Sequence, residues 1–154
     1  MDYKLQFELV PDGCWYSNLR SILSKKEWEF IRTYAIKKSS GKCSICGKKT
    51  KSLHAHERWS YDEKKGIQKL DDVIAVCPDC HSVIHIGRTQ LLGNEERAEK
   101  HFMKVNNCSY SEYRKALGIA NDIHKRRNLV SEWRLDLSFL KKLINETTEN
   151  KEEE

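Results

Sequence analysis

Four cysteines form two C-x-x-C pairs, Cys43/Cys46 and Cys77/Cys80. Two intervening residues allow one backbone turn to direct both thiolates at a single metal ion, and Gly47 permits the tight turn after the first pair. Four thiolates make a closed tetrahedral set, which is the structural type of zinc site. A redox C-x-x-C needs only one pair in a thioredoxin-like context, which the sequence lacks. The sequence therefore predicts a structural Zn²⁺ that clamps the segment between the pairs.

Four histidines lie within or just beyond this segment, and they could hold a second metal ion: His54, His56, His81 and His85. On a helix, residues four apart share one face, as His81 and His85 must if both bind one ion. The zinc clamp would hold that helix against the strand that carries the other two. We therefore expect the four imidazoles to converge, whereas His101 and His124 lack partners in sequence and are interpreted as structural or solvent-facing.

The elements that must position these side chains follow from hydrophobic periodicity and capping residues. Capping boxes at Ser24-Lys25-Lys26-Glu27 and Ser109-Tyr110-Ser111-Glu112 each open a helix. Helices are expected over residues 24–38, 78–87, 95–106 and 110–127. Strands are expected over residues 3–9, 52–60, 67–76 and 133–137. The predicted class is α+β, with one domain over residues 1–145 and a disordered acidic tail over 146–154.

The distribution of charge favours a polyanionic partner. The net charge is +5, but residues 146–154 carry five Glu and one Lys, and residues 20–65 carry 13 Lys/Arg against five Asp/Glu. A positive segment of this kind suits nucleic acid, although a solubilising surface has the same composition. No apolar run approaches the roughly 20 residues of a membrane span. The N-terminus alternates polar and apolar residues and so lacks the continuous apolar core of a signal peptide. We therefore expect no membrane association and a cytoplasmic location.

The Cys/His segment resembles the HNH nuclease family. The resemblance covers residues 43–87 and rests on CSIC, LHAHERW and VIAVCPDCHSVIH. It implies a ββα-metal (His-Me finger) unit of the subtype clamped by a four-cysteine zinc site, flanked here by helices. It also implies a metal-dependent phosphodiesterase, with a general base on the first strand and a helix that presents the metal in the minor groove of DNA.

The resemblance leaves two assignments on the first strand. If His56 is the general base, Ala55 stands where the family usually has a metal ligand. If His56 is a ligand, Glu57 stands at the base position, as in a colicin-type arrangement with three ligands: His56, His81 and His85. His54 and His56 face the same side of a strand and Glu57 faces the other, which favours the histidine pair but leaves both His54 and Glu57 as candidate bases.

The family's middle Asn corresponds to Asp72 in this chain, so an acid is expected to orient the base. Arg58 and Arg88 are candidates to contact phosphate. The metal at the histidines is expected to be Mg²⁺, Mn²⁺ or Zn²⁺.

The function expected from these residues is that of an HNH endonuclease that hydrolyses DNA phosphodiester bonds, by nicking or by double-strand cleavage. RNA is a second candidate substrate, and a homodimer or a larger nucleic-acid-processing assembly is compatible with the sequence. The alternative is a catalytically inactive zinc-binding module on the same scaffold that binds nucleic acid or protein.

Overall fold

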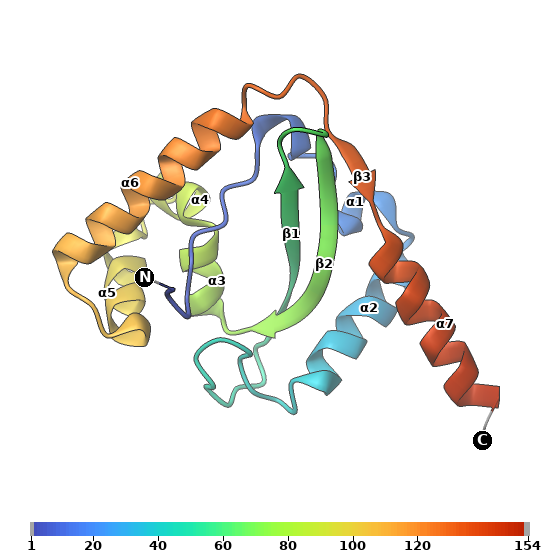
Figure 1. Ribbon diagram of the computed structural model, residues 1–154. Helices are drawn as coiled ribbons and strands as arrows, with labels where there is room; N and C mark the ends of the chain where they lie inside the picture. The colour runs from blue at the N-terminus through green and yellow to red at the C-terminus, as the bar shows by residue number, and fades with distance from the viewer. Residues whose placement is uncertain (1, 153–154) are drawn as a thin grey trace.

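A long antiparallel hairpin stands at the centre of the fold, between two groups of helices (Figure 1). The computed structural model describes residues 2–152, and side chains as far as Glu146. Strands β1 (His54–Asp62) and β2 (Ile67–Val76) form the hairpin, and the short β3 (Arg134–Asp136) pairs in parallel with β2. The class is mixed α+β, as predicted.

The helices lie on both sides of the hairpin (Figure 1). On one side are α3 (Pro78–Ile84), α4 (Ile86–Leu91), α5 (Glu95–Asn106) and α6 (Tyr110–Arg127). On the other side are α1 (Leu19–Ile22), α2 (Lys25–Lys38) and α7 (Ser138–Glu152), preceded in sequence by a 3-10 turn, η1 (Asp12–Cys14). Each side has its own apolar core, so each face of the hairpin is held in a fixed position.

Capping chemistry sets the start of α2 and α6 as predicted. Ser24 and Ser109 each accept a hydrogen bond from the backbone N–H of a glutamate three residues later, and that glutamate bonds back to the serine N–H. The helix expected after Pro78 also forms, but the predicted end at Gly87 is wrong. The backbone breaks instead at His85 (φ −97°, ψ 50°), and α4 continues through Gly87. The Thr89 hydroxyl donates to the carbonyls of Ser82 and His85, which ties α4 to the end of α3.

The strand predicted over residues 3–9 does not form. The apolar side chains of the segment nevertheless face the core: Leu5 is fully buried, and Tyr3, Phe7 and Leu9 pack on the core around Phe102. The backbone N–H groups of this segment do not pair with a neighbouring strand. The N–H of Leu5 donates to Asn106 Oδ1, and the N–H of Glu8 donates to the carbonyl of Ile84. The N-terminal segment therefore runs as an extended chain between α3 and the hairpin (Figure 1).

The C-terminal part of the chain also differs from the prediction. Helix α7 was not expected, and its backbone continues to Glu152, whereas an irregular acidic tail was expected from residue 146. The side chains of residues 147–152 and the whole of residues 153–154 lie outside the described residues.

Candidate metal centres

The four cysteines of the two C-x-x-C pairs converge on one point. Their sulfur atoms all lie within 4.8 Å of one another, and three of the four residues are buried. Cys46 Sγ lies 3.7 Å from Cys77 Sγ, which brings the two pairs together across 31 residues of sequence. The predicted grouping is confirmed, and a set of four sulfur donors fits a zinc ion.

Both C-x-x-C turns have the same local construction. In each, the first Sγ accepts a hydrogen bond from the backbone N–H of the second cysteine, at 3.5 Å for Cys43 and 3.4 Å for Cys77. Gly47 (φ +79°) closes the first turn, and Cys77 is the N-cap of α3. These bonds favour thiolates, and the contact with Cys80 lowers the pKa of Cys43 to about 4 while raising that of Cys80. A bound metal ion would stabilise all four cysteines as thiolates.

His101 contacts the cysteine centre, so it has a partner that the sequence did not indicate, which agrees with a structural role. Its Nε2 lies 3.2 Å from Cys80 Sγ, and it reaches there from α5. The neighbouring pair Arg97 and Asp79 joins α5 to α3 through two hydrogen bonds of 2.8 and 3.2 Å. His124 also has partners, the carbonyl of Val10 at 3.2 Å and the carboxylate of Asp12 at 3.5 Å.

Three of the four predicted histidines form a second candidate metal centre, which we call the histidine centre: His56, His81 and His85. One ring nitrogen of each lies within 4.8 Å of the others, and the ring centroids of His81 and His85 are 4.7 Å apart. His56 comes from β1, whereas His81 and His85 come from α3 and its C-cap. The bond from His85 N–H to His81 O (3.1 Å) keeps the two α3 histidines one turn apart despite the break at His85.

Burial favours the neutral form of two imidazoles of the histidine centre, those of His81 and His85. Loss of hydration lowers the pKa of His81 to about 3 and that of His85 to about 4, and mutual repulsion among the rings acts in the same direction. Neutral imidazole is the form that binds metal ions, so the donor set fits a divalent cation at neutral pH.

His54 lies at the exposed rim of the histidine centre. Its Nδ1 is 3.0 Å from His81 Nδ1, so one of these two nitrogens donates a hydrogen bond to the other. The side chain is exposed, unlike that of His56, which is 4% exposed. Among the four histidines, His54 is therefore the one that combines contact with the centre and access to solvent.

Glu57, the other candidate base, is turned away from the histidine centre. Its carboxylate accepts a hydrogen bond from the backbone N–H of Leu19 at the start of α1, on the opposite face of the hairpin. Burial raises its pKa, and the Leu19 bond partly offsets that rise. This carboxylate caps the first turn of α1, and the structure does not bring it to the histidines.

Asp72 and Arg58 face each other across the hairpin on the side that carries His56. The register shifts by one residue between Arg58 and Trp59, and this bulge sends Asp72 and Leu70 to opposite faces. Asp72 accepts a hydrogen bond from the N–H of Val73 (2.8 Å), and Arg58 Nε is buried without a partner in the described structure. Arg58 is two residues from His56 along β1, but Asp72 makes no hydrogen bond to any of the four histidines within the described residues, so the structure does not bring it to the predicted orienting role.

Arg88, the second predicted phosphate contact, is exposed and lies on α4. Its positive charge lowers the pKa of both His81 and His85, which places its guanidinium within electrostatic reach of the histidine centre. It is thus available to an anion that approaches the imidazoles.

Glu8 is a residue of the histidine centre that the sequence did not reveal. Its Oε2 lies 2.6 Å from His56 Nε2. In the sequence Glu8 stands on the polar side of an alternating segment far from the Cys/His region, and nothing in its spacing distinguishes it from Lys4 or Gln6. Only the path of the N-terminal segment past α3 brings it to the site.

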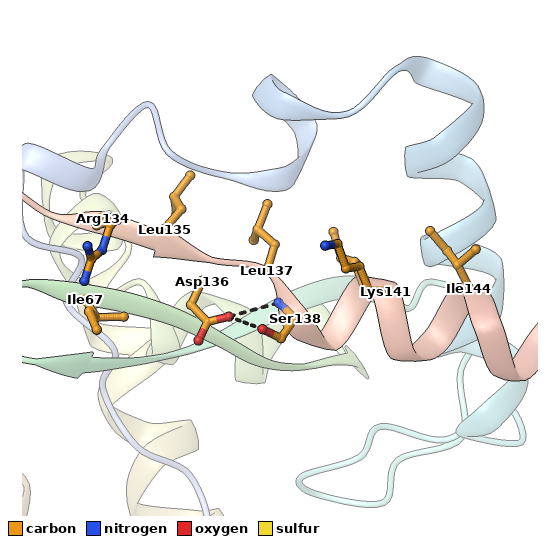
Figure 2. A pocket seen from close by; sticks show the side chains of 9 residues that line it. Ile67, Arg134, Leu135, Asp136, Leu137, Ser138, Lys141 and Ile144 are labelled. Atoms are coloured by element: carbon orange, nitrogen blue, oxygen red, sulfur yellow. Dashed lines mark hydrogen bonds between the residues drawn. The ribbon is translucent and has the colours of Figure 1, made fainter.

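A surface hollow elsewhere contains none of these residues. It has a volume of about 560 Å³ and lies between the start of β2, β3 and the first turns of α7 (Figure 2). Ile67, Leu135 and Leu137 line it together with Arg134 and Lys141, and Asp136 bonds to Ser138 at its edge. The two groups of metal-binding side chains therefore lie away from this hollow.

The chain matches no family model, no curated protein and no solved structure. Among the described residues, none of the helices has the length and apolar character needed to cross a bilayer. The features of this chain that bear on function are its two groups of metal-binding side chains and their surroundings.

Proposed function

We propose that this protein is a metal-dependent endonuclease of the HNH type that hydrolyses DNA phosphodiester bonds. The observation that carries the proposal is the convergence of His56, His81 and His85 beside an exposed fourth histidine, His54. The order of β1, β2 and α3 around these residues supports the ββα-metal assignment. The cysteine centre is assigned a structural Zn²⁺, and the histidine centre the catalytic divalent ion, Mg²⁺, Mn²⁺ or Zn²⁺.

The three ligand histidines come from two elements that the cysteine centre joins. Cys77 and Cys80 begin α3, which carries His81, and the first C-x-x-C turn is bonded to the end of β2 through Ser44 N–H and the carbonyl of Ala75 (2.8 Å). A bound divalent ion supplies Lewis acidity at the scissile phosphate. The cysteine centre thus holds the hairpin and the helix in the relative position that the three imidazoles require.

His54 is the general base in this proposal. It is the exposed histidine, and its Nδ1 meets His81 Nδ1, so its ring orientation is fixed by a residue of the centre. Imidazole exchanges protons near neutral pH, which suits removal of a proton from water. Glu57 is not assigned this role because its carboxylate is bonded to Leu19 on the other face.

The substrate assignment rests on charge around the histidine centre. Arg88 on α4 is exposed, and its charge acts on the imidazoles of both His81 and His85. An exposed guanidinium in this position can donate hydrogen bonds to a phosphate oxygen. Thirteen Lys/Arg against five Asp/Glu in residues 20–65 add long-range attraction for a polyanion.

The test is conversion of supercoiled plasmid to nicked or linear DNA by zinc-loaded protein with Mg²⁺, Mn²⁺ or Zn²⁺ added in turn. We expect metal-dependent cleavage that is lost in His56→Ala and His54→Ala and retained in Glu57→Gln. Loss in the histidine variants also excludes a contaminating nuclease. Absence of cleavage with every ion, by folded protein that retains its zinc, would contradict the proposal and favour a non-catalytic zinc module that binds nucleic acid or protein.

A further inference from the structure

The contact between Glu8 and His56 joins the N-terminal segment to the histidine centre. The two residues are 48 positions apart, and Glu8 Oε2 lies 2.6 Å from His56 Nε2. His56 is 4% exposed, so this nitrogen has little access to water and depends on the protein for its partner. A carboxylate beside a buried imidazole nitrogen makes a charge-assisted hydrogen bond, which is stronger than a neutral one.

Four further contacts hold Glu8 in this position. The Glu8 N–H donates to the carbonyl of Ile84 (2.9 Å), one residue before His85. Three residues earlier, the backbone N–H and C=O of Leu5 both bond to the side-chain amide of Asn106 at the end of α5, each at 2.9 Å. Between Leu5 and Glu8, Phe7 stacks on Phe102 with ring centroids 4.8 Å apart and planes inclined by 4°. The placement of Glu8 is therefore built into the fold.

The chemistry of a metal-binding histidine gives this contact a function. An imidazole that binds a metal through one nitrogen usually donates its other N–H to a carboxylate, a carbonyl or water, and that partner fixes both the tautomer and the ring orientation. The partner also makes the coordinating nitrogen a better donor. Because a carboxylate accepts, Glu8 takes a hydrogen bond from His56 Nε2–H, and in the neutral form of the ring Nδ1 is then the nitrogen without a hydrogen.

We propose that Glu8 is a positioning residue of the histidine centre, which holds His56 as the Nε2–H tautomer with its Nδ1 ready to bind a divalent metal. This inference rests on the proposed function in one respect, the assignment of His56 as a metal ligand. It adds the N-terminal segment and α5 to the structures that build the site, although neither belongs to the Cys/His region of the sequence.

The test compares Glu8→Ala, Glu8→Gln and Lys4→Ala in zinc-loaded protein. Lys4 is an exposed residue of the same segment and serves as the matched control. Titration with Co²⁺, followed by calorimetry and visible absorption, measures the affinity of the histidine centre without requiring DNA cleavage. We expect Glu8→Ala to weaken binding by about 10- to 100-fold, the usual effect of removing such a partner. Glu8→Gln, whose amide oxygen still accepts the bond, should lose less than Glu8→Ala, and Lys4→Ala should be unchanged.

A second readout is the ¹⁵N chemical shifts of the His56 ring in protein without Co²⁺. We expect the Nε2–H tautomer in the wild type and in Glu8→Gln, and a mixture of tautomers in Glu8→Ala. Unchanged Co²⁺ affinity in Glu8→Ala, an Nδ1–H tautomer in the wild type, or equal losses in the Ala and Gln variants would each overturn the positioning role while leaving the metal centre intact. Failure of the wild type to bind Co²⁺ at all would overturn both this inference and the proposed catalytic centre.

Discussion

Replacement of Asn106 by alanine tests whether the N-terminal segment is an integral part of the fold. Asn106 is the last residue of α5, and its side-chain amide bonds both the N–H and the C=O of Leu5 at 2.9 Å. Leu5 is fully buried, so its backbone groups lose these partners in a place that water does not readily reach. The substitution therefore removes two hydrogen bonds at one position.

The expected cost follows from those two bonds. Each intramolecular hydrogen bond contributes about 0.5–1.5 kcal/mol, and a buried group left without a partner costs about 1–3 kcal/mol. We therefore expect Asn106→Ala to lower the free energy of unfolding by about 2 kcal/mol or slightly more. With a urea m-value of about 2 kcal/mol/M, the unfolding midpoint falls by about 1 M.

The assay is urea unfolding of zinc-loaded protein, followed by circular dichroism. Asn121→Ala is the matched control, because Asn121 is an exposed residue of α6. Asn106→Ala should also weaken Co²⁺ binding at the histidine centre, because Leu5 and Glu8 belong to one segment. If Asn106→Ala shifted the midpoint no more than Asn121→Ala does, the contacts of Leu5 would not hold the segment and the reasoning would be wrong.

Four other outcomes follow from the structure. Removal of zinc by a chelator should unfold the region around the hairpin, measured by loss of circular dichroism, because a structural zinc contributes about 10 kcal/mol or more in small domains. His101→Ala should speed zinc release to a colorimetric chelator by about tenfold, since its ring contacts Cys80 Sγ; an unchanged rate would show that the contact is incidental. Glu57→Gln should leave plasmid nicking intact, because the amide oxygen can still accept from Leu19 N–H, and a large loss of rate would return Glu57 to the role of base. Gly66→Ala should lower the unfolding free energy by more than about 1–2 kcal/mol in urea titrations, because Gly66 has φ +68° and a Cβ there would lie 2.8 Å from a backbone carbonyl oxygen.

Local rules were sufficient where the determinants lie close together in sequence. The two capping boxes, the hairpin and the C-x-x-C turns each depend on contacts over a few residues, and the structure has them where the sequence predicts. The spacing of His81 and His85 likewise predicts their shared position, because one helical turn separates them. The cysteine grouping needed one long-range assumption, that both pairs face one ion, and the sulfur positions agree with it.

Contacts that depend on the path of the chain could not be predicted in this way. Glu8 reaches His56 because the N-terminal segment crosses α3, and His101 reaches Cys80 because α5 packs on α3. The strand predicted over residues 3–9 was wrong for the same reason: alternation shows which side is buried, but a strand also requires a neighbour to pair with. The face of Glu57, in contrast, follows from local geometry. Neighbouring residues of a strand point to opposite faces, so Glu57 lies on the other side of β1 from His56.

The most direct test of the account is to locate the metals in crystals of zinc-loaded protein soaked in Mn²⁺, by anomalous diffraction at the zinc and manganese edges. The account predicts a zinc peak among the sulfurs of Cys43, Cys46, Cys77 and Cys80. It predicts a separate manganese peak bound by the imidazoles of His56, His81 and His85, with His54 at its rim. A zinc peak alone, with the histidines free of metal at saturating Mn²⁺, or a manganese ion held elsewhere, would contradict the assignment of a catalytic metal centre.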